Sequence, residues 1–209
     1  MRRYGIPVAI VACLAAGVFL LLLALDVGRW RTAMASDDVT YRSSPQSQLW
    51  APRTFLPAGV SRFLLGVGDD IAYRRALRAF RLARIAAPAL SDPSVVILRN
   101  EAIVRLSDVV GHSRDPLRRS QAANLLGAIA YSQALADFTN RARLIVAAAQ
   151  QFGQAVTFDP SNDDAKYNLE LTLALGKATS LTESGGGTNP APGGKGSRGA
   201  GAGDPGTGF

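Results

Sequence analysis

An uncharged run over residues 6–25, IPVAIVACLAAGVFLLLLAL, dominates the start of this chain and makes it a poor candidate for folding in water. As a helix the run is about 30 Å long, which matches the hydrocarbon thickness of a bilayer. A buried helix in a water-soluble domain seldom carries so long a stretch without charge. We therefore expect residues 1–31 to form an uncleaved, single-pass membrane anchor. Trp30 follows the run between two arginines, and we expect it to lie at the lipid headgroups.

Two processed forms remain open beside the anchor. Residues 33–35, Ala-Met-Ala, resemble the cleavage site of a removable signal peptide, although they lie well beyond the end of the apolar run. Residues 10–13, Ile-Val-Ala-Cys, resemble a lipobox, but cleavage before Cys13 would leave an apolar tail on the mature protein. We favour the uncleaved anchor, with Cys13 as a small lipid-facing side chain.

The positive charges that flank the apolar run bear on the orientation of the chain in the membrane. Arg2 and Arg3 precede the run, and Arg29 and Arg31 follow it, so the flanking positive charge is nearly balanced. A short N-terminal tail and a long C-terminal part favour a cytoplasmic N-terminus. We expect the C-terminal domain to be extracytoplasmic.

The connector that follows the anchor, residues 32–62, contains three prolines. Their spacing is incompatible with a continuous helix across the segment. Its aromatic content is nevertheless too high for a purely flexible tether. We expect an extended stretch over residues 33–47, followed by docking of Trp50 and Phe55 on the domain.

Helical patterning begins at Asp69 and fades near Leu181, and no segment of useful length alternates as a strand does. We expect an all-α domain over residues 63–183. Asp69 and Asp70 are the expected N-cap of its first long helix. The expected helices cover residues 71–86, 94–109, 117–136, 138–158 and 163–181. Residues 184–209 hold 11 of the 21 glycines without a strict triplet period, which predicts a disordered tail.

One spacing, Ala-x3-Phe-x2-Ala-x4-Pro, occurs twice, with the copies 72 residues apart. In a helical hairpin the small residues let two helices approach, the phenylalanine fills the space between them, and the proline ends the turn. The separation is close to twice the tetratricopeptide period of about 34 residues. The two copies are Ala76, Phe80, Ala83 and Pro88, and Ala148, Phe152, Ala155 and Pro160.

With the Leu126-Gly127 pair and the run AKYNLE at residues 165–170, the chain resembles the tetratricopeptide repeat family. Ala123 and Ala130 depart from the family, which prefers large aromatics there. An irregular helical bundle with chance spacing is the alternative. The anchor followed by FDPSNDDAKYNLEL is similar to membrane-tethered tetratricopeptide proteins that accompany MoxR-type ATPases and von Willebrand A-domain proteins in bacteria. That resemblance implies membrane or envelope proteins as partners.

The composition leaves few catalytic options. One cysteine and one histidine exclude a disulfide framework and a His/Cys metal site. The chain contains no phosphate-binding glycine loop and no HExxH, GxSxG or CxxC motif. The acidic pairs Asp69-Asp70 and Asp163-Asp164 each open a helix, where capping accounts for them, and His112 is expected in a solvated turn. We expect a non-enzymatic protein with no cofactor and no metal.

Much of the formal net charge of +7 is concentrated on one side of the first domain helix. Such a basic face suits a polyanion, but no aromatic interleaving or reading motif accompanies it, so we expect no nucleic acid partner. Anionic lipid headgroups or an anionic wall polymer are the candidate ligands, and a merely solvated face is the alternative. The basic face consists of Arg74, Arg75, Arg78, Arg81 and Arg84.

The resemblance also implies a peptide groove, because first helices of stacked repeats line a concave surface. Asn124, Lys166 and Asn168 would lie on such helices, and an amide side chain both donates and accepts hydrogen bonds. Internal packing of Asn168 is the alternative. We expect a membrane-anchored interaction scaffold or assembly subunit of a bacterial envelope complex. The alternative function is an envelope module that binds anionic lipid or wall polymer through the basic face.

Overall fold

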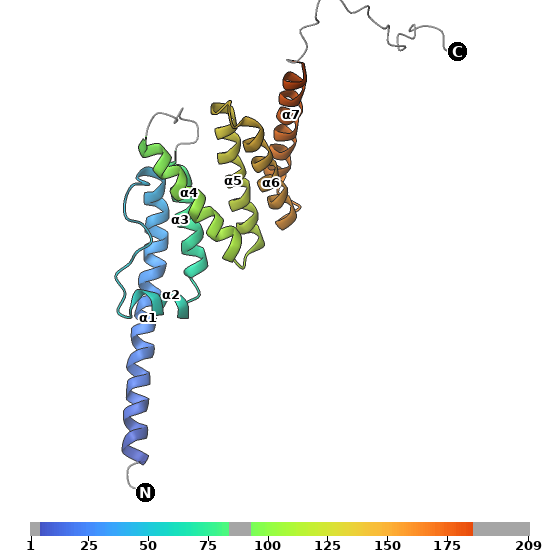
Figure 1. Cartoon of the computed structure of the whole chain (residues 1–209). Coiled ribbons are helices and arrows are strands. Elements are labelled where there is room, and N and C mark those ends of the chain that lie inside the picture. The colour runs from blue at the N-terminus through green and yellow to red at the C-terminus, as the bar shows by residue number, and fades with distance from the viewer. Residues whose placement is uncertain (1–4, 84–92, 186–209) are drawn as a thin grey trace, which may run out of the picture.

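The computed structural model describes residues 5–83 and 93–185 (Figure 1). Within these ranges every regular element is a helix, which confirms the all-α class. Of the residues singled out above, Arg2, Arg3, Arg84, Pro88 and the tail from residue 186 lie outside the described ranges. The helices are α1 (Gly5–Ser43), α2 (Ala58–Leu64), α3 (Gly68–Leu82), α4 (Pro93–His112), α5 (Pro116–Ala136), α6 (Arg141–Phe158) and α7 (Asp163–Gly185).

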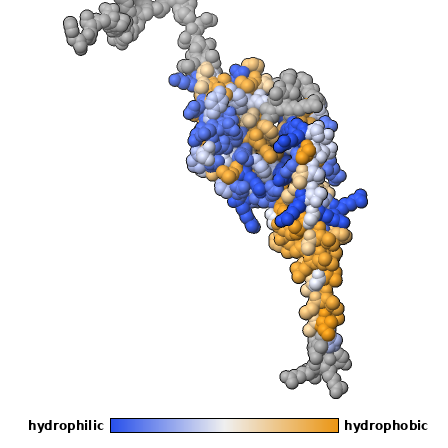
Figure 2. All heavy atoms as spheres, turned by 180° about the vertical axis from the view of Figure 1, so that it is seen from behind, coloured by the Kyte–Doolittle hydropathy of each residue, from blue (hydrophilic) through white to orange (hydrophobic). Residues whose placement is uncertain are grey.

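Helix α1 is unbroken from Gly5 to Ser43 and carries the apolar run on its N-terminal part (Figure 1). Its most apolar window has a mean hydropathy of 3.0 and no residue of that window is buried in the protein. By length and composition α1 fits a membrane span, and a signal sequence near the N-terminus would have the same composition. Figure 2 shows the apolar surface covering this helix up to the base of the domain.

We predicted an extended stretch over residues 33–47. This prediction is wrong for residues 33–43, because α1 continues to Ser43. Beyond Pro7, in the first turn of α1, the chain has no proline before Pro45. Trp30, Met34 and Tyr41 also recur at helical spacing and pack on one cluster, so the same face of α1 is used beyond the apolar run. Trp30 itself is 3% exposed, so its indole packs against the protein, and its predicted depth at the headgroups stays a prediction.

The connector folds back along α1 and completes a small core between α1 and α3 (Figure 1). This core contains Trp30, Leu49, Trp50 and Ile71, so Trp50 docks as expected. Phe55 is half exposed and lies under the Arg29 guanidinium, 3.8 Å from its ring centroid. A short helix, α2, follows directly after this segment, in a region where we expected none.

Trp50 is fixed in an unusual backbone conformation by carboxylates of α1. Its φ is 54°, in the left-handed region that costs a non-glycine residue about 1–2 kcal/mol. The Trp50 backbone N–H donates to Asp37 Oδ2 at 2.6 Å, and its indole Nε1 donates to Asp38 Oδ1 at 3.0 Å. These two bonds to charged acceptors offset the strain and set the position of the connector.

Helices α3 to α7 pack one after another, each antiparallel to the one before it (Figure 1). Their bounds agree with the expected helices to within a few residues over α4 to α7. The largest core lies between α3, α4 and α5, where Ala76, Leu106 and Ile129 are buried. Small residues at these contacts let the helix backbones approach closely, and the larger side chains fill the remaining space.

The twice-repeated spacing occupies buried positions in both copies. Ala76, Ala83, Ala148 and Ala155 are fully buried, Phe152 is 2% exposed and Phe80 is partly buried, while Pro160 is exposed in the turn after α6. The copies lie on α3 and α6, three helices apart. A repeat of two helices places equivalent helices an even number apart. The spacing is therefore a packing pattern in both places, and the hairpin repeat stays a prediction.

Two caps were predicted, and one of them is wrong. Helix α3 begins one residue before Asp69, with Val67 at its N-cap and no side-chain capping bond. Asp69 and Asp70 lie in the first turn, where their charge still favours the helix dipole. At α7, Asn162 Oδ1 accepts the Ala165 backbone N–H at 3.0 Å and caps the helix as expected.

Candidate functional site

The predicted basic face is turned toward the connector and the upper part of α1. Arg78 Nε donates to the Pro45 carbonyl at 2.6 Å, and its Nη2 donates to the Gln46 carbonyl at 3.2 Å. Arg81 donates to both carbonyls of residues 41–42 at 2.9 Å. The Tyr41 and Arg42 carbonyls belong to the last turn of α1, where helical acceptors have no partner within the helix.

The other two described arginines of this face also have partners inside the protein. Arg74 forms an ion pair with Asp38 on α1 and bonds Asp70 through Nε at 3.0 Å. Burial alone would lower the pKa of Arg74, but the hydrogen bonds that Arg74 donates to Asp38 and Asp70 outweigh the effect of burial and raise the pKa. Arg75 donates to the Trp50 carbonyl at 3.3 Å. Burial and neighbouring arginines lower the pKa of Arg75.

We call Arg74, Arg75, Arg78 and Arg81 the arginine clasp, because together they hold α3 against α1 and the connector. Each member donates at least one hydrogen bond to a residue between 38 and 50. The described part of the basic face is therefore an internal interface. Arg84 lies outside the described residues.

The predicted groove residues are brought together only in part. Asn168 Nδ2 on α7 donates to Asn124 Oδ1 on α5 at 3.0 Å, so the two amides pair with each other. Lys166 is exposed and its Nζ lies 2.9 Å from Asp163 Oδ1, in the same helical turn. Asn124 also lines an open cavity of about 520 Å³ between α3, α5 and the start of α7.

Of the three predicted groove residues, only Asn124 lines this cavity, and most of its other lining residues were not predicted as a site. Tyr73 and Leu77 line it from α3, and Gln121 from α5. The Tyr73 hydroxyl donates to Gln121 Oε1 across the cavity wall. Burial is the main cause that raises the pKa of Tyr73. The opposite wall is acidic, with Asp159, Asp163 and Asp164, so the cavity favours a polar or basic chain over an apolar one.

A different surface, the outer face of α7, is apolar and uncovered within the described residues. Helix α7 buries Ala165 and Thr172 against its neighbours. On its opposite side four residues recur at helical spacing, and all four are exposed. Tyr167 is 67% exposed and Leu171 is 42% exposed. We call this surface the α7 stripe: Tyr167, Leu171, Ala174 and Ala178.

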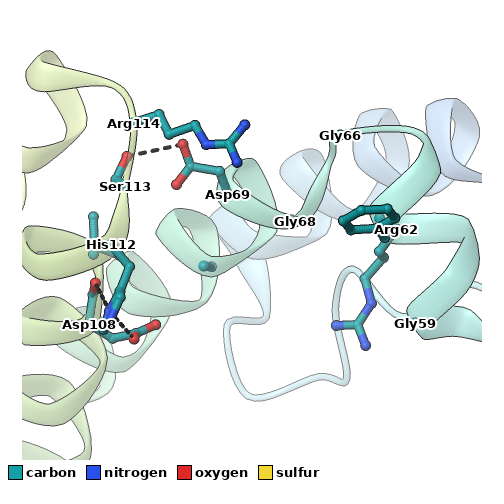
Figure 3. A pocket seen from close by; sticks show the side chains of 12 residues that line it. Gly59, Arg62, Gly66, Gly68, Asp69, Asp108, His112, Ser113 and Arg114 are labelled. Atoms are coloured by element: carbon teal, nitrogen blue, oxygen red, sulfur yellow. Dashed lines mark hydrogen bonds and ion pairs between the residues drawn. The ribbon is translucent and has the colours of Figure 1, made fainter.

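A second cavity, of about 580 Å³, lies between α2, the start of α3 and the end of α4 (Figure 3). His112 and Ser113 both line it, but they do not form a nucleophile and base pair. Ser113 Oγ donates to Asp69 Oδ2 at 3.0 Å, whereas His112 Nδ1 lies 2.9 Å from Asp108 Oδ1 (Figure 3). The hydroxyl is thus held by the Asp69 carboxylate, which also lies 3.7 Å from the Arg118 guanidinium, and His112 is not its partner.

Among residues 5–83 and 93–185 no group of three or more His, Cys, Asp or Glu side chains is placed to hold a metal ion. The acidic residues at the start of α3 are engaged in ion pairs with Arg118.

No family model, curated protein or solved structure matches this chain.

Proposed function

We propose that the chain is a single-pass membrane protein whose helical domain docks a partner protein at the membrane. Its role would be non-catalytic, as a scaffold or assembly subunit of a bacterial envelope complex, with the N-terminus cytoplasmic and the domain extracytoplasmic. The observation that carries the docking function is the α7 stripe. The resemblance to membrane-tethered tetratricopeptide proteins supports the same reading.

Retention of the N-terminal helix is supported by contacts that lie before residues 33–35, the candidate cleavage site. Asp26 is fully buried and accepts the backbone N–H groups of Phe55 and Leu56, at 2.7 and 3.1 Å. The Trp30 indole donates to Ser61 Oγ at 3.0 Å. Cleavage after Ala35 would remove both partners and leave these buried groups unsatisfied. An uncleaved anchor keeps the domain intact.

The α7 stripe is suited to a helix of the partner protein. Tyr and Leu side chains at helical spacing present a narrow apolar surface of the kind that another amphipathic helix covers. Asp164 and Glu170 border the stripe and are exposed. We therefore propose a partner helix with an apolar face and flanking basic residues.

The alternative function, binding of anionic lipid or wall polymer through the basic face, has less support. The four arginines of the clasp already donate to acceptors within the chain. Recruiting them to an external polyanion would require breaking these bonds and releasing the connector.

Co-purification of the full-length protein tests the proposal. The protein is solubilised from its native membrane in mild detergent after brief cross-linking, and proteins bound to the wild type are compared with those bound to a Tyr167→Glu and Leu171→Glu double variant. We expect the double variant to lose a partner that the wild type retains, because charge on the stripe opposes burial.

The matched control is Phe138→Glu, since Phe138 is 74% exposed and lies in the α5–α6 turn, outside the α7 stripe. This variant should retain the partner, and circular dichroism should show the same helix content in all three proteins. A monomer without a specific partner, or equal recovery by the wild type and the double variant, would contradict the proposed docking function.

A further inference from the structure

Helix α2 lies beside α1 at the point where the apolar run ends. Asp26 is the first residue after the run, and its carboxylate accepts the backbone N–H groups of residues 55–56. Four residues later, Trp30 donates to Ser61 in α2. At 1.5 Å per residue this bond lies about 6 Å beyond Asp26 along α1.

That distance corresponds to the interfacial layer of a bilayer. The hydrocarbon core is about 30 Å thick and the whole bilayer about 40–45 Å, which leaves an interfacial layer of about 5–8 Å on each side. If the apolar run fills the hydrocarbon core, α2 is held within that layer by Asp26 and Trp30.

The side chains of α2 are arranged the opposite way from those of a helix that faces water. The polar residue Ser61 is fully buried, whereas Phe63 is 84% exposed and Val60 and Leu64 are more than two-fifths exposed, at 42% and 47%. A surface helix in water turns its apolar side inward and its polar side outward. Phe55, just before α2, is also 50% exposed.

The exposed residues are continuous with the surface of the span. Figure 2 shows the apolar surface of α1 widening where it reaches the base of the domain. Arg29 is exposed at this level and stacks on the Phe55 ring. A guanidinium above an aromatic ring is the arrangement expected where the ring faces the acyl chains and the charge faces the headgroups.

We propose that Phe55, Val60, Phe63 and Leu64 insert into the interfacial layer of the bilayer that α1 crosses, so that the protein contacts the membrane at a second place. The occupant of this surface is lipid, at the boundary between headgroups and acyl chains. The contact fixes the tilt of the domain relative to the membrane, because α1 and α2 then both meet the same bilayer. This inference rests on the proposed membrane anchor.

The depth of single labelled positions tests the inference in the full-length protein. In a Cys13→Ala background, Phe63→Cys is labelled with an environment-sensitive fluorophore and the protein is reconstituted in phosphatidylcholine vesicles that contain a nitroxide-labelled lipid. The same label is placed at Phe138→Cys, at the far end of the domain, and at Leu20→Cys, within the apolar run. Phe138 and Leu20 are 74% and 62% exposed in the protein, so all three labels are accessible.

We expect the nitroxide lipid to quench the labels at positions 20 and 63 several-fold more strongly than the label at position 138. Quenching at position 20 with none at position 63 would overturn the interfacial contact while leaving the anchor standing. Absence of quenching at position 20 would overturn the anchor and, with it, this inference. A label at position 63 that is shielded from lipid and from a water-soluble quencher alike would indicate protein on this surface and would also overturn the proposal.

Discussion

A Cβ atom on Gly127 would lie 2.6 Å from Cδ1 and Cε1 of the Phe152 ring, closer than real atoms approach. The two residues belong to α5 and α6, and Phe152 is 2% exposed, so the ring has nowhere to move cheaply. The α5–α6 hairpin therefore depends on a glycine at this position. Gly127 belongs to the Leu126-Gly127 pair of the tetratricopeptide resemblance and Phe152 to the twice-repeated spacing, and their contact gives both residues a physical reason.

Gly127→Ala should destabilise the domain by about 1–3 kcal/mol through overpacking against Phe152. Gly153→Ala is the matched control, because a Cβ there meets no atom within 4 Å. In the control the substitution should be neutral or stabilise the helix by up to about 1 kcal/mol. Thermal unfolding of the detergent-solubilised proteins, followed by circular dichroism, measures both. Equal transition temperatures for Gly127→Ala and the wild type would show that the ring relaxes freely.

Asp26→Leu should release the connector from α1. The substitution keeps the approximate size of the side chain but removes the acceptor of the Phe55 and Leu56 backbone N–H groups, and each buried donor left unsatisfied costs about 1–3 kcal/mol. Hydrogen exchange of these two amides should accelerate markedly. The exposed Glu101→Ala, which loses only a surface pair with Arg105, should leave their exchange unchanged. Unaltered protection in Asp26→Leu would mean that other groups hold the connector.

Arg78→Ala should loosen the chain just beyond the end of α1. The guanidinium donates to the carbonyls of Pro45 and Gln46, and loss of these charge-assisted bonds should cost about 1–2 kcal/mol locally. Limited proteolysis should then cut near residues 44–48 faster than in the wild type. Arg105→Ala removes the same charge without touching the connector, so its cleavage rate should match the wild type. If both variants are cut at the same rate, the clasp does not restrain this segment.

Asp159 provides a titration test of the turn between α6 and α7. The Ser161 hydroxyl and then the Ser161 backbone N–H, at 2.6 and 2.9 Å, lower the pKa of the carboxyl below its ordinary value. A lowered folded-state pKa contributes stability that is present above the unfolded pKa and is lost as the pH falls through the folded pKa. Ser161→Ala should raise the pKa of Asp159 toward its ordinary value, which NMR titration of the carboxyl would detect.

Asp137 serves as the internal reference in that titration. Its pKa is also lowered, mainly by the Asn140 side chain and then by the Asn140 backbone N–H, and not by Ser161. The pKa of Asp137 should therefore stay where it is in Ser161→Ala. An unchanged Asp159 pKa in the variant would show that the hydroxyl bond is not the main cause.

The helices of the domain were predictable because their evidence is local. Prolines, caps and periodic apolar residues mark the bounds of α4 to α7, and Asn162 caps α7 as its sequence position indicated. The continuation of α1 was not predicted because the proline argument was applied to the whole connector, although the first proline of the connector is Pro45. Helix α2 was missed because its seven residues carry too short a pattern to recognise.

The roles of the arginines could not be read from the sequence. Arg78 and Arg81 meet acceptors that lie 32 to 40 residues earlier in the chain, and those acceptors are backbone carbonyls that leave no trace in residue types. Trp30 illustrates the same limit. Its place after an apolar run indicated a headgroup contact, but only the folded connector brings Ser61 and Trp50 against it.

Helix α1 is unbroken from the apolar run to Ser43, so the distance between the end of the run and the far end of α1 is fixed. From Asp26 to Ser43 the helix rises about 26 Å, and the clasp and connector stiffen that part of it. If α1 spans a bilayer as we propose, a rotation of α1 about its own axis would also rotate the outer face of α7, so the orientation of the span would set the direction in which the α7 stripe faces.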